Sequence, residues 1–235
     1  MALPKINTVL YDLELPSSGK KIEYRPFLVK EEKILLMALE GKDDREMSKA
    51  IKQIITQCVS TENFNVNKLA MIDLEYLFLN IRGKAVGDIS TISFKHECGE
   101  IIKLDIDLSK VEVVQNKNSS DLVKITDDIT VRLSPPGIDD VIGTENKNQI
   151  DLVMEIIRNS LLEIIQGEEV FSAQDHTKAE LDEFVNSLNS GQFKKLQDYY
   201  ESLPKMTQDI EYTCKKCGKT ETETLEGLAS FFASA

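Results

Sequence analysis

The segment 214–218, of sequence CKKCG, constrains the fold of this chain most, because it has the form of a zinc knuckle. Two thiolates on a tight turn can bind one metal ion, and Gly218 can take the positive φ that such a turn needs. The flanking residues alternate and are rich in β-prone types, so we expect the knuckle at the tip of a hairpin. A structural zinc site has four ligands, and this hairpin supplies two.

The other two ligands are predicted in the segment 96–99, which lies far upstream between two strand-like runs. Side chains two apart on a strand point to the same face, so His96 and Cys98 could reach one ion. We therefore predict one structural zinc site that joins the middle of the chain to its end. Its ligands would be His96, Cys98, Cys214 and Cys217.

Other interpretations of these residues stay open. Cys98 could be a free thiol near a surface turn, and His96 an ordinary exposed imidazole. A redox role for the CxxC pair needs the motif to open a helix whose N-terminus stabilises the thiolate, whereas the flanks here are strand-like. A catalytic zinc keeps one position open and usually has a glutamate nearby, but Glu97 would project from the strand face opposite the ligands. Cys58 falls on the apolar stripe of a predicted helix, so we expect it in the core.

The chain of 235 residues is acidic, with 40 Asp and Glu against 28 Lys and Arg and a formal net charge of −12. This balance argues against binding to duplex nucleic acid or to a membrane surface, because both depend on basic patches. No apolar run approaches the roughly 20 residues of a membrane span, and the N-terminal segment has no long apolar region typical of a signal peptide. In a reducing compartment, four cysteines are better explained as metal ligands or core residues than as disulfides. Composition thus favours a protein that binds other proteins.

The first half of the chain alternates between strand and helix patterns. Residues 1–88 predict a hairpin followed by three helices. Residues 89–134 predict β-hairpins, the first of which carries half of the zinc site. A boundary is expected at 135–137, of sequence PPG, or in the loop that runs to about Asn148.

The second half predicts mostly helices, which makes the whole chain α+β. Residues 148–204 are expected to be helical, with one helix over 150–165 and another that begins at a capping box on Thr177. Residues 205–235 predict the zinc-ribbon-like hairpin and a short terminal helix that packs back on 89–110.

The sequence contains no motif for enzymatic chemistry. There is no phosphate-binding loop and no GxSxG nucleophile turn. The acidic pairs at 127–128 and 139–140 are typical of turns, and His176 lies in a polar loop where we expect it to be solvated. We therefore predict no catalytic residue, no cofactor-binding residue and no enzymatic activity.

Two segments of the first hundred residues form a recognisable set. They are 24–37, of sequence YRPFLVKEEKILLM, and 73–79, of sequence DLEYLFL, with Ile81 and Arg82 after it. Together with the CxxCG hairpin and its short helix, they resemble the baseplate hub subunit and hub-assembly proteins of T-even-like contractile-tailed phages. The resemblance covers the first hundred residues and the last thirty, whereas 149–204 matches only in character.

The resemblance implies a structural or assembly protein that helps to build the central hub of the tail baseplate in the host cytoplasm. It would act through contacts with other baseplate or tail hub proteins, without a small-molecule substrate and without a membrane, and could remain in the virion tail. We expect partner contacts at the start of a charged helix and on the terminal helix. The residues are Arg25, Phe27, Leu228, Phe231 and Phe232. Internal packing is the alternative for the terminal helix.

A second function stays open beside this one. A zinc-ribbon adaptor that binds nucleic acid or a polymerase would explain the basic residues at the predicted hairpin tip, Lys215, Lys216 and Lys219. The charge of the whole chain argues against it. Such an adaptor would show steeply salt-dependent binding to nucleic acid.

Overall fold

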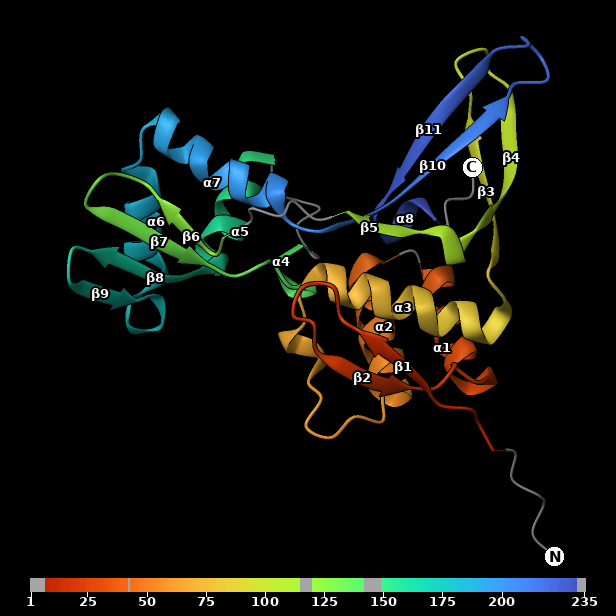
Figure 1. Ribbon diagram of the computed structural model, residues 1–235, viewed down its shortest axis with the longest axis horizontal. Coiled ribbons are helices and arrows are strands. Elements are labelled where there is room, and N and C mark those ends of the chain that lie inside the picture. The colour runs from red at the N-terminus through yellow and green to blue at the C-terminus, as the bar shows by residue number, and fades with distance from the viewer. Residues whose placement is uncertain (1–6, 42, 115–119, 142–148, 232–235) are drawn as a thin grey trace, which may run out of the picture. The chain divides into compact units, whose positions relative to one another are not determined.

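The computed structural model describes residues 7–41, 43–114, 120–141 and 149–231. The chain divides into two compact units, labelled by element in Figure 1. Unit 1 contains Met1–Val114 and Pro204–Ala235, and unit 2 contains Gln115–Leu203. The two ends of the sequence therefore fold together, with unit 2 inserted between them.

The helical part of unit 1 confirms the predicted hairpin followed by three helices. Its elements are β1 (Tyr11–Glu14), β2 (Lys21–Tyr24), α1 (Val29–Gly41), α2 (Asp44–Cys58) and α3 (Met71–Val86), with a 3-10 turn, η1, at Val66–Lys68. Leu74, Leu77 and Ile81 of α3 are fully buried at helical spacing. Ser17, in the β1–β2 turn, donates its backbone N–H and its hydroxyl to the buried carboxylate of Asp73 at 2.8 and 2.5 Å. This pair of hydrogen bonds holds the hairpin on α3.

The rest of unit 1 is built from two antiparallel hairpins that lie side by side (Figure 1). The first consists of β3 (Ile89–Lys95) and β4 (Ile101–Asp107), and the second of β10 (Lys205–Thr213) and β11 (Thr220–Glu226). We call these four strands and their two turns the hairpin pair. Between the hairpins lies a small core of Ile102, Tyr212 and Cys214, against which Phe94, Cys98 and Leu104 pack.

Short elements connect the hairpin pair to α3. A 3-10 turn, η2 (Leu108–Lys110), leads from β4 to β5 (Glu112–Val114), which pairs with the start of β10. The short helix α8 (Gly227–Ser230) follows β11, and the N–H of Leu228 donates to the carboxylate of Glu75 in α3 at 3.1 Å. The hydroxyl of Ser90, in β3, donates to the backbone oxygen of the buried Phe231 at 3.0 Å. The segment from Leu228 to Phe231 is therefore held by both α3 and β3.

Unit 2 is a four-stranded antiparallel sheet with helices packed on it. The strands, in sheet order, are β6 (Leu122–Lys124), β7 (Ile129–Leu133), β8 (Leu161–Gln166) and β9 (Glu169–Ser172). The helices are α4 (Ile138–Val141), α5 (Gln149–Ser160), α6 (Lys178–Asn186) and α7 (Ser190–Ser202), with a 3-10 turn, η3, at Ala173–Asp175. The predicted capping box at Thr177 is confirmed, and a second one, at Asn189, begins α7.

The core of unit 2 is formed between one face of the sheet and the helices. Its buried side chains are Ile125, Val131, Leu133, Ile157, Leu161, Val185, Leu196 and Tyr199. Lys195 adds a polar tie, because its ammonium donates to the backbone oxygens of Lys124 and Ile125 at 3.0 and 2.8 Å, at the end of β6.

The mixed α+β class is confirmed, but the prediction of one helix over 150–165 is wrong. α5 ends at Ser160, and Leu161–Gln166 forms β8, which pairs with β7 on one side and β9 on the other. The run LLEIIQ is apolar enough to fit a helix or a buried strand, and periodicity alone does not separate the two. Ile164 and Ile165 are β-branched, and Gly167 takes a φ of +61° in the turn to β9. Pairing on both edges therefore outweighs the local helical pattern.

Among the residues that the structure describes, no helix is long and apolar enough to cross a membrane.

Candidate metal centre

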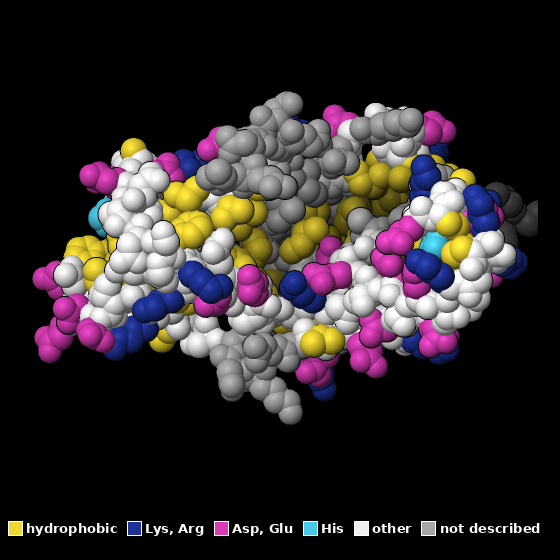
Figure 2. Space-filling model, turned by 90° about the horizontal axis from the view of Figure 1, so that it is seen from above, with side chains coloured by type: hydrophobic (Ala, Val, Ile, Leu, Met, Phe, Trp, Pro, Cys, Tyr) yellow, Lys and Arg dark blue, Asp and Glu magenta, His cyan; other side chains and the backbone are white. Residues whose placement is uncertain are grey.

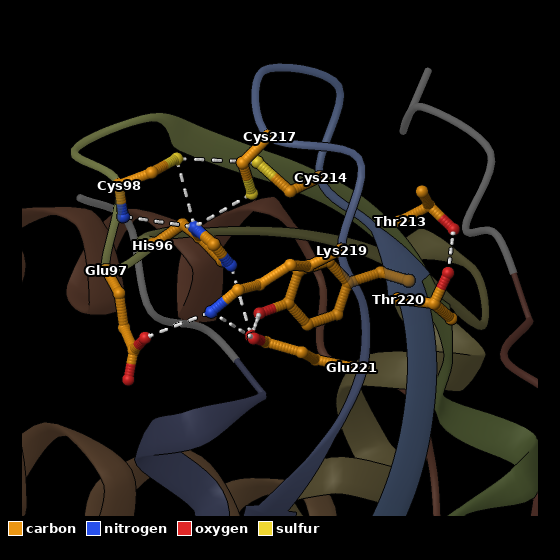
Figure 3. A network of polar contacts seen from close by, with 10 residues as sticks. His96, Glu97, Cys98, Thr213, Cys214, Cys217, Lys219, Thr220 and Glu221 are labelled. Carbon is orange, nitrogen blue, oxygen red and sulfur yellow. Dashed lines mark hydrogen bonds and ion pairs between the residues drawn. The ribbon is translucent and has the colours of Figure 1, made fainter.

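The two hairpin tips bring together the four residues whose spacing predicted a zinc site (Figure 3). His96 and Cys98 lie in the turn between β3 and β4, and Cys214 and Cys217 in the turn between β10 and β11. One ligand atom from each residue lies within 4.8 Å of the other three. Segments more than a hundred residues apart in the sequence thus meet in one cluster.

The separations within the cluster fit tetrahedral coordination. The Sγ atoms of Cys98 and Cys214 are 3.6 Å apart, and His96 Nδ1 lies 3.1 Å from Cys98 Sγ and 4.0 Å from Cys217 Sγ. Zinc bonds of about 2.3 Å to sulfur and 2.0 Å to nitrogen place tetrahedral ligands about 3.8 Å apart for two sulfurs and about 3.5 Å apart for sulfur and nitrogen. Small movements of the side chains would bring the four atoms around one ion. A donor set of three sulfurs and one imidazole nitrogen suits zinc.

The two turns have related backbone geometry. Cys214 N–H donates to Lys219 O and Gly218 N–H donates to Cys214 O, both at 2.8 Å. In the upstream turn, His96 N–H donates to Glu100 O and Gly99 N–H to His96 O, again at 2.8 Å. Gly218 and Gly99 both have positive φ, +74° and +83°, which favours glycine. The upstream turn is shorter by one residue, and this explains its His-x-Cys spacing in place of Cys-x-x-Cys.

The thiol of Cys214 is prepared for ionisation by the knuckle itself. Backbone N–H groups of Cys217 and Lys216 donate to its sulfur, which lowers the pKa of Cys214 to about 7. At Cys98, the N–H of Glu100 favours the thiolate, but burial and the thiols of Cys214 and Cys217 outweigh it and raise the pKa. Three thiols this close resist joint ionisation, and a divalent cation would remove that resistance because bound thiols are deprotonated.

His96 is nearly fully buried, with 4% of its surface exposed, and its second nitrogen has a partner of its own. Nε2 lies 3.1 Å from Glu221 Oε2, and the same oxygen accepts a hydrogen bond from the Tyr212 hydroxyl at 3.2 Å (Figure 3). The sequence did not indicate Glu221, because the alternation of Thr and Glu in β11 is typical of a solvated strand. Tyr212 and Glu221 are directly opposite in the hairpin, and this pairing becomes visible only when the register of the two strands is known.

Charged side chains of both signs surround the hairpin tips (Figure 2). Lys216 Nζ donates to the backbone oxygen of Cys98 at 3.1 Å, and Lys219 Nζ lies 3.7 Å from Glu97 and 3.9 Å from Glu221. Two of the three basic residues at the tip are therefore engaged locally. Glu97 is largely exposed and faces Lys219.

The residues predicted to contact partners lie mostly inside unit 1. Arg25 donates to Glu31 at 2.8 Å and to Gln57 O at 2.9 Å, and Phe27 is buried with 7% exposed. Leu228 and Phe231 are 9% and 0% exposed, which corresponds to the internal packing that the sequence left as the alternative. Phe232 lies outside the described residues. Partner binding by this set stays a prediction.

Comparison with protein families gave one match that spans both units. A family model described as "T4 bacteriophage base plate protein" matches residues 8–233. Comparison with curated proteins and with solved structures found no match. The matched span includes the four residues of the metal-ligand cluster.

Proposed function

Because this chain belongs to the family of T4 bacteriophage base plate proteins, we propose that it is a structural or assembly component of the central hub of a phage tail baseplate. Membership in a structural baseplate family gives no support to an enzymatic role. The family match carries the baseplate assignment. The hub position rests on the likeness of 24–37 and 73–82 to hub proteins, and assembly would take place in the host cytoplasm.

The metal-ligand cluster supports a structural zinc ion as part of this function. Four protein ligands would leave no position for water or substrate, so the ion would stabilise and not catalyse. It would join the two hairpin tips and hold the hairpin pair rigid. Elemental analysis of the purified chain should give one zinc per molecule, and a fully folded chain with none would contradict the assignment.

We place the contact surface on α1, which follows the predicted contact residues Arg25 and Phe27 in the chain. Val29, Leu36 and Met37 are 80%, 54% and 62% exposed, and their spacing places them on one face of the helix. Arg25 and Phe27 would contribute indirectly, by fixing the start of α1 against α2. Exposed apolar side chains on one helix face are typical of protein contacts, so we propose other baseplate proteins as the partners.

The composition of purified particles tests the role in assembly. Quantitative mass spectrometry of particles and of lysate from the same infection should find the chain in particles in a fixed ratio to other baseplate proteins. A chain abundant in lysate but missing from particles would be an assembly factor that leaves. If disrupting its gene yields particles with a normal baseplate, the proposal is wrong.

A pair of variants tests the contact surface. Leu36→Glu should reduce incorporation into particles, whereas Val170→Glu should not. Val170, in unit 2, is a matched control because its exposure of 58% is close to that of Leu36. Equal incorporation of both variants would remove α1 from the interface.

A further inference from the structure

We infer that Glu221, supported by Tyr212, is a positioning residue that turns Nδ1 of His96 toward the metal. This inference rests on the proposed zinc site and names the part of it that selects the ligand atom. The starting observation is that the two nitrogens of the buried imidazole face different groups.

Two separate contacts of His96 indicate the same tautomer. Nε2 lies 3.1 Å from Glu221 Oε2, and a carboxylate oxygen accepts, so the hydrogen belongs on Nε2. Nδ1 lies 3.2 Å from the backbone nitrogen of Cys98, whose N–H can only donate. Nδ1 is therefore the acceptor nitrogen. The same nitrogen is 3.1 and 4.0 Å from the sulfurs of Cys98 and Cys217, so it borders the cluster, and on metal binding its single lone pair would pass from the Cys98 N–H to the ion.

Tyr212 holds the carboxylate in place from the core of the hairpin pair. Tyr212 and Glu221 are directly opposite in the register of β10 and β11, and the hydroxyl donates to Glu221 Oε2 at 3.2 Å. The tyrosine ring is packed edge-on against Phe94, with centroids 5.2 Å apart, and is perpendicular to the ring of His96 at 6.2 Å. The position of Glu221 is thus set by buried neighbours.

The contact between His96 and Glu221 also connects the two hairpins, because one residue belongs to the β3–β4 turn and the other to β11. It can form without metal, so it orients the imidazole before an ion arrives. Outer residues of this kind raise the basicity of the ligand and restrict its ring, and their loss typically lowers metal affinity 10–100-fold. Glu221 would therefore contribute to affinity without binding the ion.

Chelator competition on the purified full-length chain tests the effect on affinity. Glu221→Ala should weaken zinc binding about 10–100-fold. Glu221→Gln, which keeps an acceptor but loses the charge, should have a smaller effect in the same direction, and so should Tyr212→Phe. Glu223→Ala is the matched control, two residues further along the same face of β11 and exposed, and should bind zinc like the unchanged chain.

The nitrogen resonances of the histidine side chain test the orientation of the His96 ring. If Glu221 had only a structural role, its replacement would not change these resonances. With zinc bound, the unchanged chain should show coordination through Nδ1 and a protonated Nε2, and Glu221→Ala should show a mixture of forms. Coordination through Nε2, or unchanged affinity and resonances in Glu221→Ala, would overturn the inference while leaving the zinc site intact. A chain that binds no zinc at all would instead overturn the zinc proposal, and this inference with it.

Discussion

Unit 2 and the tips of the hairpin pair differ in the size of the buried cluster that holds their strands together. Among the described residues of unit 2, eight buried apolar side chains form one core cluster between a four-stranded sheet and its helices. Around the two hairpin tips, the described residues form a cluster of three buried side chains, Ile102, Tyr212 and Cys214, and the last of these is a candidate metal ligand. Isolated hairpins are marginally stable at best, and small structures with little core commonly depend on a metal or a disulfide. We therefore expect a metal bound by the cluster to compensate for the small core at the hairpin tips.

The two regions also differ in how the chain builds them. Unit 2 is a single continuous segment, whereas the hairpin pair joins strands from the middle of the sequence with strands from its end. Closing a long loop costs conformational entropy, although this cost rises slowly with length. A metal bound by both hairpin tips would offset that cost.

Loss of a zinc ligand should have the largest effect. Cys214→Ser should abolish zinc binding and unfold the hairpin pair while unit 2 stays folded, because apparent binding energies of structural zinc are about 10–16 kcal/mol. Nuclear magnetic resonance spectra would separate the two regions. Cys58→Ala, a buried thiol of α2 outside the cluster, is the matched control and should keep its zinc.

Loss of core volume should reverse the pattern. Leu196→Ala, at a fully buried position of unit 2, should lower the free energy of unfolding by about 2–5 kcal/mol and leave zinc content unchanged. Ile102→Ala, in the hairpin pair, should cost less in the zinc-loaded chain than in the chain without metal. Urea titration measures both. An equal loss of stability for Ile102→Ala with and without zinc would contradict the idea that the metal compensates for a small core.

The buried ion pair at the start of α1 tests whether the stability of the helices of unit 1 is independent of metal binding. Glu31 is fully buried, bonded to Arg25 and to the N–H of Leu28 at 2.8 Å each. Glu31→Ala should cost about 3–5 kcal/mol, because it leaves the charge of Arg25 unpaired, and zinc affinity should stay the same. Glu46→Ala, in the exposed pair with Lys49, should cost less than about 1 kcal/mol.

The same ion pair has a defined dependence on pH. Burial alone would raise the pKa of Glu31, but the hydrogen bonds from Arg25 and Leu28 outweigh it and hold the pKa below its usual range. A lowered pKa means that the contribution of Glu31 is complete above pH 4.5 and is lost as the pH falls through the folded-state pKa. The difference between Glu31→Ala and the unchanged chain should shrink over that range. A constant difference would contradict the role of the charged pair.

The smallest effect is expected where the hairpin pair is anchored to α3. Burial raises the pKa of Glu75 above 4.5, although the N–H of Leu228 opposes the shift. An ionised Glu75 therefore costs stability at neutral pH, and the cost disappears as the folded form takes up a proton at lower pH. Glu75→Gln keeps an acceptor for Leu228 and should raise the melting temperature slightly at pH 7. The gain should vanish below about pH 4.5, and a gain that persists there would have another cause.

The four residues of the cluster could be predicted from the sequence because their spacing is a local property. The CxxCG turn and the His-x-Cys turn each have a spacing that suits two metal ligands. Because a structural zinc ion needs four ligands, the two turns are predicted to form one site. Glu221 could not be found in this way, since its function depends on the register of β10 and β11 and on the place of His96 in another hairpin.

The strand β8 was missed for a related reason. Its residues suit either a helix or a buried strand, and the decision comes from β7 and β9, which pair with it from elsewhere in the chain. The burial of Phe27 and Phe231 could not be predicted for the same reason, because an apolar side chain can face the core or a partner and only its neighbours decide which.

Hydrogen exchange of the full-length chain, with and without a zinc chelator, tests whether a metal bound by the cluster holds the hairpin pair together. Amides of the hairpin pair should lose protection when zinc is removed, most strongly around the turns at 96–99 and 214–218, while the strands and helices of unit 2 keep theirs. Zinc added back should restore the original pattern. If the hairpin pair stays equally protected without zinc, the cluster does not hold the hairpins together and the account is wrong.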